Sequence, residues 1–197
     1  MMKILLSLTV LAACAATHPT TTTPNEVDPI LAVRRAQMIQ WLHEYDVAGV
    51  YPTDDTGMPL SVFQDARGVR CPMAELMHRS GRDDLVAMVV HANNALRLAE
   101  VHDGPLYDWM TSSGLTHDEI AMVQGAMSFD TIKTIEQLDQ HVAARGEVHG
   151  HLETAQVALR VATAQALPVA ARERAAARTR QAVKTTLASL QSSGTTR

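Results

Sequence analysis

The sequence predicts a mainly α-helical protein, in which a compact multi-helix module with one small β-hairpin is followed by a helical hairpin or stalk. Aromatic residues make up only 4% of the chain, so the core must be built mainly from Leu, Val, Met and Ala, which favours closely packed helices. Apolar residues recur at spacings of three and four, as on one face of a helix. The expected boundaries are 28–128 for the module, 130–190 for the hairpin or stalk and 191–197 for a disordered tail.

The first helix of the module is expected at 29–47. Asp28 suits the N-cap position and Pro29 the first helical position, and Gly49 suits the C-terminal end. Four apolar residues then share one face of this helix: Leu31, Met38, Leu42 and Tyr45.

A loop and a small hairpin are expected next. Residues 49–60 hold Gly and Pro among Asp and Thr, which is typical of a loop. Two short β-prone runs then flank a turn from Asp65 to Gly68, which predicts a β-hairpin near 61–71.

Two helices are expected to follow the hairpin. Pro72 can open the first, which would run up to Ser80 and Gly81. Ser80 and Asp83 match a capping box for the second. Because that segment is apolar nearly all round as far as Ala99, it is expected to be the central buried helix.

The remaining helices of the module begin at recognisable signals. Gly104-Pro105 breaks the chain before a short helix that ends at Gly114. Thr116 and Glu119 then match a capping box for a helix at 117–126. Two apolar residues lie where a hydrophobic staple belongs: Leu115 and Ile120.

Beyond residue 130 an Ala-rich apolar stripe predicts a tight helix–helix contact. Gly146 and Gly150 are expected to weaken this helix, Pro168 is expected to end or kink it, and a last helix is expected at about 169–190. The stripe consists of Leu152, Ala155, Leu159, Ala162, Ala166 and Val169. The last helix carries Val183, Leu187 and Leu190 on one face and Arg174, Arg178, Arg180 and Lys184 on the other.

The N-terminus has the pattern of an export signal. Lys3 precedes a short apolar run at 4–11, which is far below the roughly 20 residues that span a bilayer and suits a signal peptide at 1–13. Leu11-Ala12-Ala13-Cys14 resembles a bacterial lipobox. The resemblance implies cleavage before Cys14 and a covalent lipid on that cysteine, while Ala15 favours the outer membrane over inner-membrane retention.

A Thr- and Pro-rich segment follows the cysteine. Residues 14–27 are poor in apolar bulk, and such a segment stays extended and cannot bury enough surface to fold. We therefore expect a tether between the lipidated cysteine and the folded module.

A set of motifs in the module resembles a recurring pattern in uncharacterised exported bacterial proteins. The resemblance covers about a third of the chain and implies a real folded module, but it transfers no catalytic residue. The matching positions are Phe63, Asp65, Gly68, Cys71-Pro72-Met73-Ala74, Asn93-Asn94, Trp109, Ser113-Gly114-Leu115-Thr116, Ala121 and Gln124.

Cys71 is the first candidate for chemistry. With Cys14 lipidated, no intramolecular disulfide remains possible, and a lone thiol beside a histidine base could be a nucleophile. The preferred interpretation is a buried small apolar residue, because a reactive cysteine needs an accessible, electropositive setting.

Histidines near the start of the stalk are the second candidate. His141, His149 and His151 could hold a metal only if three or four ligands converged. Residues 149 and 151 point about 200° apart on one helix, so solvated histidines are preferred, and no metal or other cofactor is expected.

Two further groups could bind a partner. Asn93 and Asn94 lie in an apolar segment and must find hydrogen-bond partners, either a ligand or, as preferred, the backbone of the hairpin loop. The four basic residues of the last helix could contact anionic phospholipid or a phosphate-rich envelope polymer, although a solvated face is preferred.

These observations predict an exported lipoprotein, anchored in the outer membrane and facing the periplasm or the surface, with a non-catalytic binding or assembly role. Its expected partners are the membrane and an envelope protein or cell-wall component. Nucleic acid is not expected, because the net charge is −4. The alternative is an envelope hydrolase that uses Cys71 or a histidine-bound metal.

Overall fold

A computed structural model of the chain describes residues 28–125 and 137–193. Within these ranges the protein is mainly helical, as predicted. The elements are α1 (Pro29–Ala48), α2 (Pro72–Arg79), α3 (Asp83–Asn93), the 3-10 helix η1 (Leu98–Glu100), α4 (Gly104–Ser112), α5 (His117–Gly125), α6 (Gln137–Val161) and α7 (Thr163–Ser193). The expected signal peptide, Cys14 and the tether lie outside the described residues. None of the described helices is long and apolar enough to cross a membrane.

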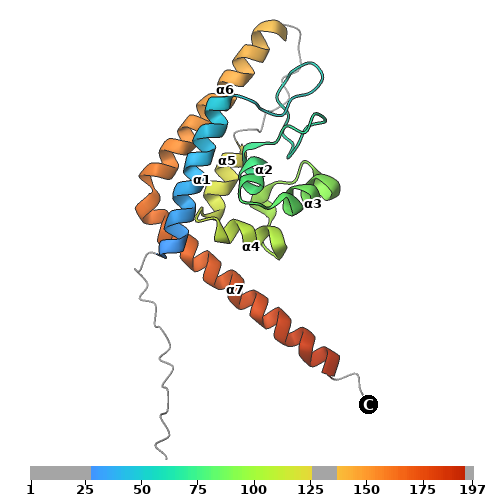
Figure 1. Cartoon of the computed structure of the whole chain (residues 1–197), viewed down its shortest axis with the longest axis vertical. Helices are drawn as coiled ribbons and strands as arrows, with labels where there is room; N and C mark the ends of the chain where they lie inside the picture. The colour runs from blue at the N-terminus through green and yellow to red at the C-terminus, as the bar shows by residue number, and fades with distance from the viewer. Residues whose placement is uncertain (1–27, 126–136, 194–197) are drawn as a thin grey trace, which may run out of the picture.

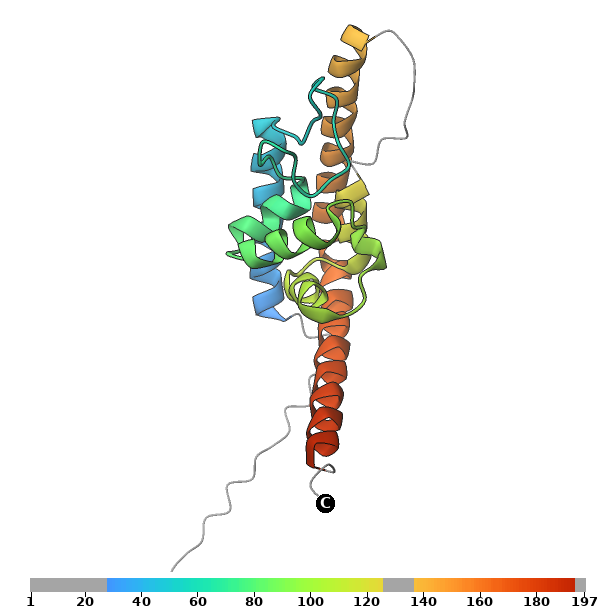
Figure 2. The same cartoon turned by 90° about the vertical axis from the view of Figure 1, so that its right-hand side faces the viewer.

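The two long helices α1 and α6 lie side by side and run in opposite directions, and α2 to α5 pack against them (Figures 1 and 2). From the lower end of α6, α7 turns away and extends beyond the other helices. It does not fold back along α6, so these two helices form no hairpin. The tail expected at 191–197 is wrong for its first three residues, because α7 continues to Ser193, and the rest of it lies outside the described residues.

Helix α1 begins and ends as its sequence predicts. The Asp28 carboxylate accepts a hydrogen bond from the backbone N–H of Ile30 at 2.9 Å, and Gly49 ends the helix at φ +61°. All four residues of the predicted apolar face are buried. Two charged side chains, Arg35 and Asp46, are buried on α1 with them.

Helix α2, and not α3, is the central helix of the module. Met73, Ala74 and Leu76 of α2 are fully buried. In α3 the buried residues are Leu85, Val86 and Val89, whereas Met88 is 42% exposed. The prediction for α3 is therefore wrong, because this helix ends at Asn93 on the outside of the module and its apolar character continues onto a solvent-facing side.

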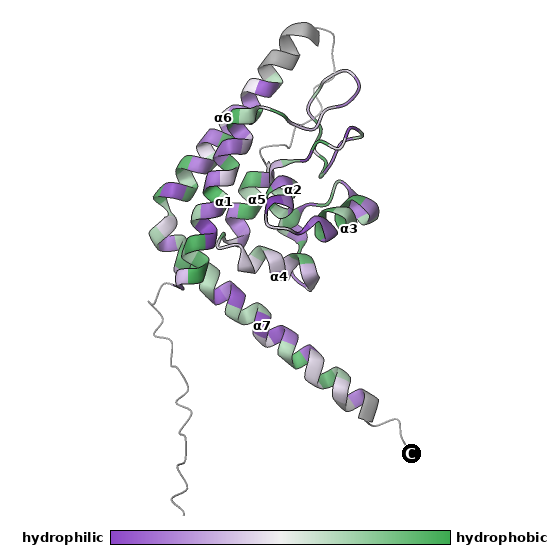
Figure 3. Ribbon diagram, in the orientation of Figure 1, coloured by the Kyte–Doolittle hydropathy of each residue, from purple (hydrophilic) through white to green (hydrophobic). Residues whose placement is uncertain are grey.

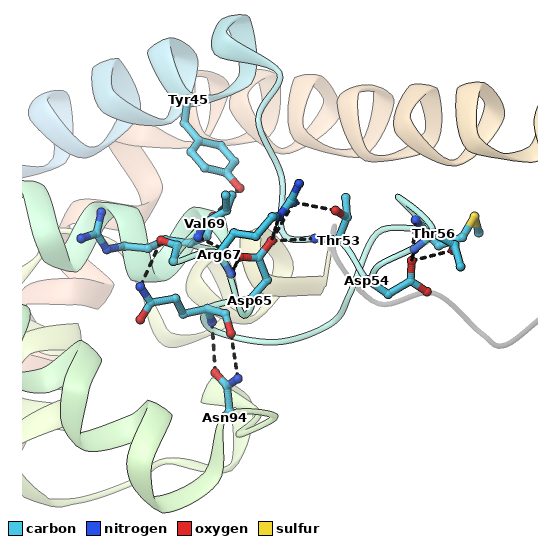
Figure 4. A network of polar contacts seen from close by, with 12 residues as sticks. Tyr45, Thr53, Asp54, Thr56, Asp65, Arg67, Val69 and Asn94 are labelled. Carbon is cyan, nitrogen blue, oxygen red and sulfur yellow. Dashed lines mark hydrogen bonds and ion pairs between the residues drawn. The ribbon is translucent and has the colours of Figure 1, made fainter.

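The β-hairpin predicted near 61–71 is not formed. Only an isolated antiparallel bridge joins Gln64 and Arg70. Cys71 N–H donates to the Phe63 carbonyl and Asp65 N–H to the Val69 carbonyl, but side chains hold other N–H groups that a longer ladder would use. The Asp65 carboxylate accepts from the backbone N–H of Arg67 and Val69, each at 2.9 Å. The same carboxylate also accepts from Thr53 N–H at 3.1 Å, which ties the preceding loop to this turn (Figure 4).

Of the two predicted capping boxes, one is confirmed and one is wrong. Thr116 N–H donates to the Glu119 carboxylate at 2.9 Å, and Glu119 N–H donates back to the Thr116 hydroxyl at 3.3 Å. Ser80 makes no cap for α3: its hydroxyl donates to the Met77 carbonyl and accepts from the Trp109 indole N–H. The N-cap of α3 is Arg82, without a side-chain bond.

The break between α6 and α7 lies at Ala162, six residues before the predicted position, and Pro168 lies inside α7. The glycines of α6 do not interrupt it. The Leu159 carbonyl accepts from the Thr163 hydroxyl at 2.8 Å and from the Arg35 guanidinium at 2.7 Å. Side chains thus occupy the Leu159 carbonyl just before the break at Ala162, more than two turns before Pro168.

Candidate functional site

Cys71 is buried at the start of α2, with 2% of its surface exposed. Its sulfur accepts a weak hydrogen bond from the backbone N–H of Ala74 at 3.5 Å, which makes it the N-cap of the helix. Burial raises the pKa of the thiol to about 11. A nucleophilic cysteine instead has a lowered pKa and an accessible sulfur, so this geometry favours a structural role for the thiol.

Asn94 binds the turn segment through both ends of its amide. It accepts from the backbone N–H of Gln64 at 3.0 Å and donates to the Gln64 carbonyl at 2.8 Å (Figure 4). The preferred interpretation of this residue is therefore confirmed. The Asn93 side chain is exposed and accepts from Ala95 N–H at 3.1 Å, within its own turn, so the two neighbouring amides have different roles.

Gln124 on α5 makes a second clamp of the same kind. Its amide donates to the Leu96 carbonyl at 2.8 Å and accepts from Leu98 N–H at 2.7 Å. Together with Asn94, which binds Gln64, it fixes the irregular chain between the end of α3 and the start of η1. Both amides belong to the motif set singled out in the sequence, and in this structure they satisfy backbone groups.

The three candidate metal ligands are not brought together. His149 pairs with the buried Asp46 of α1, with 2.7 Å between Nδ1 and the carboxylate. His151 is exposed on the same helix, and the side chain of His141 lies outside the described residues. Within the part of the chain that the structure describes, no three His, Cys, Asp or Glu side chains form a group able to hold a metal.

Asp46 is the centre of a polar cluster between α1 and α6. Besides His149, its carboxylate accepts from the Gln156 amide at 2.9 Å and from the Tyr51 hydroxyl at 3.2 Å. His43 in turn contacts the other end of the Gln156 amide at 3.1 Å. Hydrogen bonding and the charge of Asp46 raise the pKa of His149, while burial and then Asp46 raise the pKa of Tyr51 to about 12.

Three of the four basic candidates on α7 have partners within the protein. Arg174 donates to the Asp28 carboxylate at 2.9 Å and Lys184 to the Asp103 carboxylate at 2.9 Å. The Arg180 guanidinium lies 5.3 Å from the centre of the Tyr107 ring and donates to the His102 carbonyl. Arg178 is exposed, and its side chain has no hydrogen-bond partner among the described residues.

The sequence did not reveal the buried ion pair of Arg35 and Glu119. The two side chains meet through two hydrogen bonds of 2.7 Å, and the Arg35 side chain is 1% exposed. Arg35 also donates to the carbonyls of Gly114 and Leu159 and to the Thr163 hydroxyl. An arginine in the middle of the apolar face of α1 was the available signal, because a buried charge requires a partner.

The Arg35–Glu119 pair lies where α1, the turn between α4 and α5, and the bend between α6 and α7 meet. Gly114 permits the close approach of that turn to α1. Gly114 has φ +86°, and a Cβ atom built on it would lie 2.4 Å from the Leu31 carbonyl oxygen of α1. The turn between α4 and α5 can therefore approach α1 this closely only with glycine.

Comparisons with protein-family models, with curated proteins and with solved structures found no match. The roles given to residues here accordingly rest on geometry. In that geometry Cys71, Asn94, Gln124 and the Asp46 cluster hold segments of the fold together.

Proposed function

We propose that this protein is a membrane-anchored envelope lipoprotein with a non-catalytic binding or assembly role. The proposal rests on exposed apolar side chains in the outer half of α7, which is the part of the helix beyond Ala177. Among the described side chains of that helix, Ala177 is the last that is buried, and beyond it Val183 and Leu187 are 53% and 54% exposed. Apolar side chains held in solvent on a projecting helix suit docking to another molecule.

The outer half of α7 is not a simple apolar face. Bands of hydrophilic and hydrophobic residues alternate along it (Figure 3). A mixed surface of this kind is typical of an interface that forms and dissociates in water, rather than of a segment that belongs to a permanent core.

The position of the described N-terminus supports the anchoring part of the proposal. Asp28, the first described residue, is ion-paired with Arg174 near the start of α7 at 2.9 Å. The start of α1 lies beside the part of α7 that begins to project (Figure 1), and this is where the proposed tether to Cys14 would join the folded body. The lipobox resemblance supplies the chemistry: a thioether-linked lipid on Cys14. No other cofactor is proposed.

The anchor is tested by the intact mass of the protein extracted from membranes. We expect a mass that corresponds to a chain beginning at Cys14 with lipid attached, and we expect Cys14→Ser to abolish both the cleavage and the added mass. Cys71→Ser is the matched control and should leave them unchanged. An unmodified mass for the native chain would contradict the proposal.

The binding role is tested by placing a photo-crosslinking residue at Leu187 or, as control, at Met88 in intact cells. Both positions are about half exposed, but Met88 lies on α3 of the module. We expect one discrete adduct from position 187 and none from position 88. Equal adducts, or none, would show that the outer half of α7 has no specific partner.

The alternative of a thiol hydrolase is not supported by the surroundings of Cys71. The sulfur is buried, and its pKa is raised. Cys71→Ala should therefore retain biological function, and a complete loss of function in a folded variant would revive the alternative.

A further inference from the structure

A groove of about 660 Å³ lies between α4 and the stretch of α7 from Arg174 to Thr186. One wall is the end of α4, with Thr111 and Ser112, and the other is successive turns of α7, with Arg174, Arg178, Gln181 and Thr185. The groove is open to solvent along its length. It involves none of the polar clusters described above, except that Arg174 also binds Asp28.

Two guanidiniums, Arg174 and Arg178, line this groove together with one carboxylate, Asp108, and neither guanidinium forms an ion pair with it among the described residues. Arg174 and Arg178 are one helical turn apart, and a like-charged pair at this spacing is unfavourable. Burial, and then the charge of Arg178, lower the pKa of Arg174. Asp28 compensates one of these guanidiniums, while Arg178 has no ion pair among the described residues. An anion bound here would remove the repulsion.

The hydroxyl groups of the groove offer acceptors rather than donors. Thr185 donates to the Gln181 carbonyl at 3.0 Å, Thr111 to the Asp108 carbonyl at 3.2 Å and Ser112 to the Trp109 carbonyl at 2.9 Å. Because each hydrogen is already used within its own helix, the lone pairs of these oxygens remain for donors from a ligand. Sugar hydroxyls are such donors.

We propose that the groove between α4 and α7 binds a sugar phosphate, with the phosphate at Arg174 and Arg178 and the sugar hydroxyls against Thr111, Ser112 and Thr185. Guanidinium groups suit phosphate because they donate two parallel hydrogen bonds to its oxygens. None of the described residues that line the groove is aromatic, which disfavours a nucleotide, since bases stack on aromatic rings. The inference deepens the proposed binding role and rests on it, but it does not depend on the lipid anchor.

The test is isothermal titration of the full chain carrying Cys14→Ser, which removes any lipid, with glucose 6-phosphate, inorganic phosphate and glucose as separate probes. We expect glucose 6-phosphate to bind most tightly and glucose most weakly. Arg178→Gln should weaken glucose 6-phosphate by about tenfold or more, because it removes a charged hydrogen-bond donor.

Arg172→Gln is the matched control, since Arg172 is exposed on the same helix but does not line the groove. It should leave the affinity within about twofold, because exposed charges outside the site are largely screened. Thr185→Val should weaken glucose 6-phosphate but not inorganic phosphate. The absence of saturable binding, equal losses in Arg172→Gln and Arg178→Gln, or equal affinity for glucose and its phosphate would each overturn the proposal.

Sedimentation with vesicles distinguishes the two possible sources of the phosphate, which are a lipid headgroup and an envelope polymer. Binding of the same Cys14→Ser chain to phosphatidylglycerol vesicles that is lost in Arg178→Gln would assign the groove to a lipid headgroup. Binding of soluble glucose 6-phosphate without such sedimentation would assign it to an envelope polymer. Since this chain carries no lipid, a failure here leaves the anchoring of the native chain untouched.

Discussion

The buried side chain of Arg35 joins several segments of the fold through hydrogen bonds. Its guanidinium carries five N–H donors, and Glu119, two backbone carbonyls and the Thr163 hydroxyl accept from it. A buried charge is tolerated when it is paired and its donors are satisfied. The side chain thus links α1 to the start of α5 and to the bend between α6 and α7.

Glu119→Gln should therefore lower the free energy of unfolding by about 3–5 kcal/mol, because it leaves a buried guanidinium without its counter-charge. Urea denaturation followed by circular dichroism measures this change. Arg34→Gln is the control, since Arg34 neighbours Arg35 but is exposed, and its effect should stay below about 1 kcal/mol. Equal effects of the two substitutions would argue against the special position of the buried pair.

His149 makes the contact between α1 and α6 depend on pH. Its pKa is raised above the ordinary value of 6.5 by the hydrogen bond to Asp46. A group whose pKa is raised by folding stabilises the fold fully below its unfolded pKa, and this contribution is lost as the pH rises through the folded pKa. The contact is therefore strongest under mildly acidic conditions.

His149→Gln should accordingly destabilise the protein more at about pH 5.5 than at about pH 9. Thermal unfolding across this pH range measures the difference. His151→Gln is the comparison, because His151 is exposed on the same helix and should show no such trend. A destabilisation by His149→Gln that stays constant across the range would exclude a charged contact with Asp46.

At the scale of elements, the sequence predicted the features that depend on neighbouring residues. The Asp28 cap, the Gly49 end and the Thr116–Glu119 box were all predictable, because each joins residues a few positions apart. The prediction of a hairpin near 61–71 was wrong for the opposite reason, because the contacts that decide this segment join residues far apart in sequence. The N–H groups of Phe63 and Gln64 donate to Asn94, about thirty residues away, and no local pattern contains that contact.

The same difference between local and distant contacts applies to the residues of the candidate site. Burial of Cys71 and the link from Asn94 to the turn segment were the preferred interpretations, since an apolar setting and an amide in need of partners are visible in sequence. The pairing of Asp46 with His149 joins residues 103 positions apart. It was not predictable, because exposed and paired histidines look alike in a helical stretch.

Asn94 should be important to the turn segment while Asn93 is not. Asn94→Ala removes two hydrogen bonds from the partly buried backbone of Gln64 and should cost about 1–3 kcal/mol. Asn93→Ala, at the exposed neighbouring position, should cost less than about 0.5 kcal/mol. Urea denaturation gives both values, and hydrogen exchange at the Gln64 amide should accelerate only in Asn94→Ala. Unchanged exchange there would show that the clamp is dispensable.

At the scale of the whole molecule, α7 consists of two parts with different roles. Its inner part is in the core, where Ala170 and Leu167 pack against Leu31 of α1 and Ala177 joins the main apolar cluster. Its outer part, beyond Ala177, contributes no buried described side chain. The helix therefore serves the fold at its inner end, while the proposed binding role belongs to its exposed outer end.

Truncation at two points separates these roles. A chain ending at residue 185 keeps every side chain of α7 that is described as buried, so its melting temperature should change by less than about 2 °C. A chain ending at residue 169 loses Ala170, Ala177 and the Arg174–Asp28 pair, and its melting temperature should fall by roughly 10 °C. Differential scanning calorimetry measures both. If the shorter deletion is as destabilising as the longer one, the outer part of α7 belongs to the core, and its exposed Leu187 needs no partner to explain it.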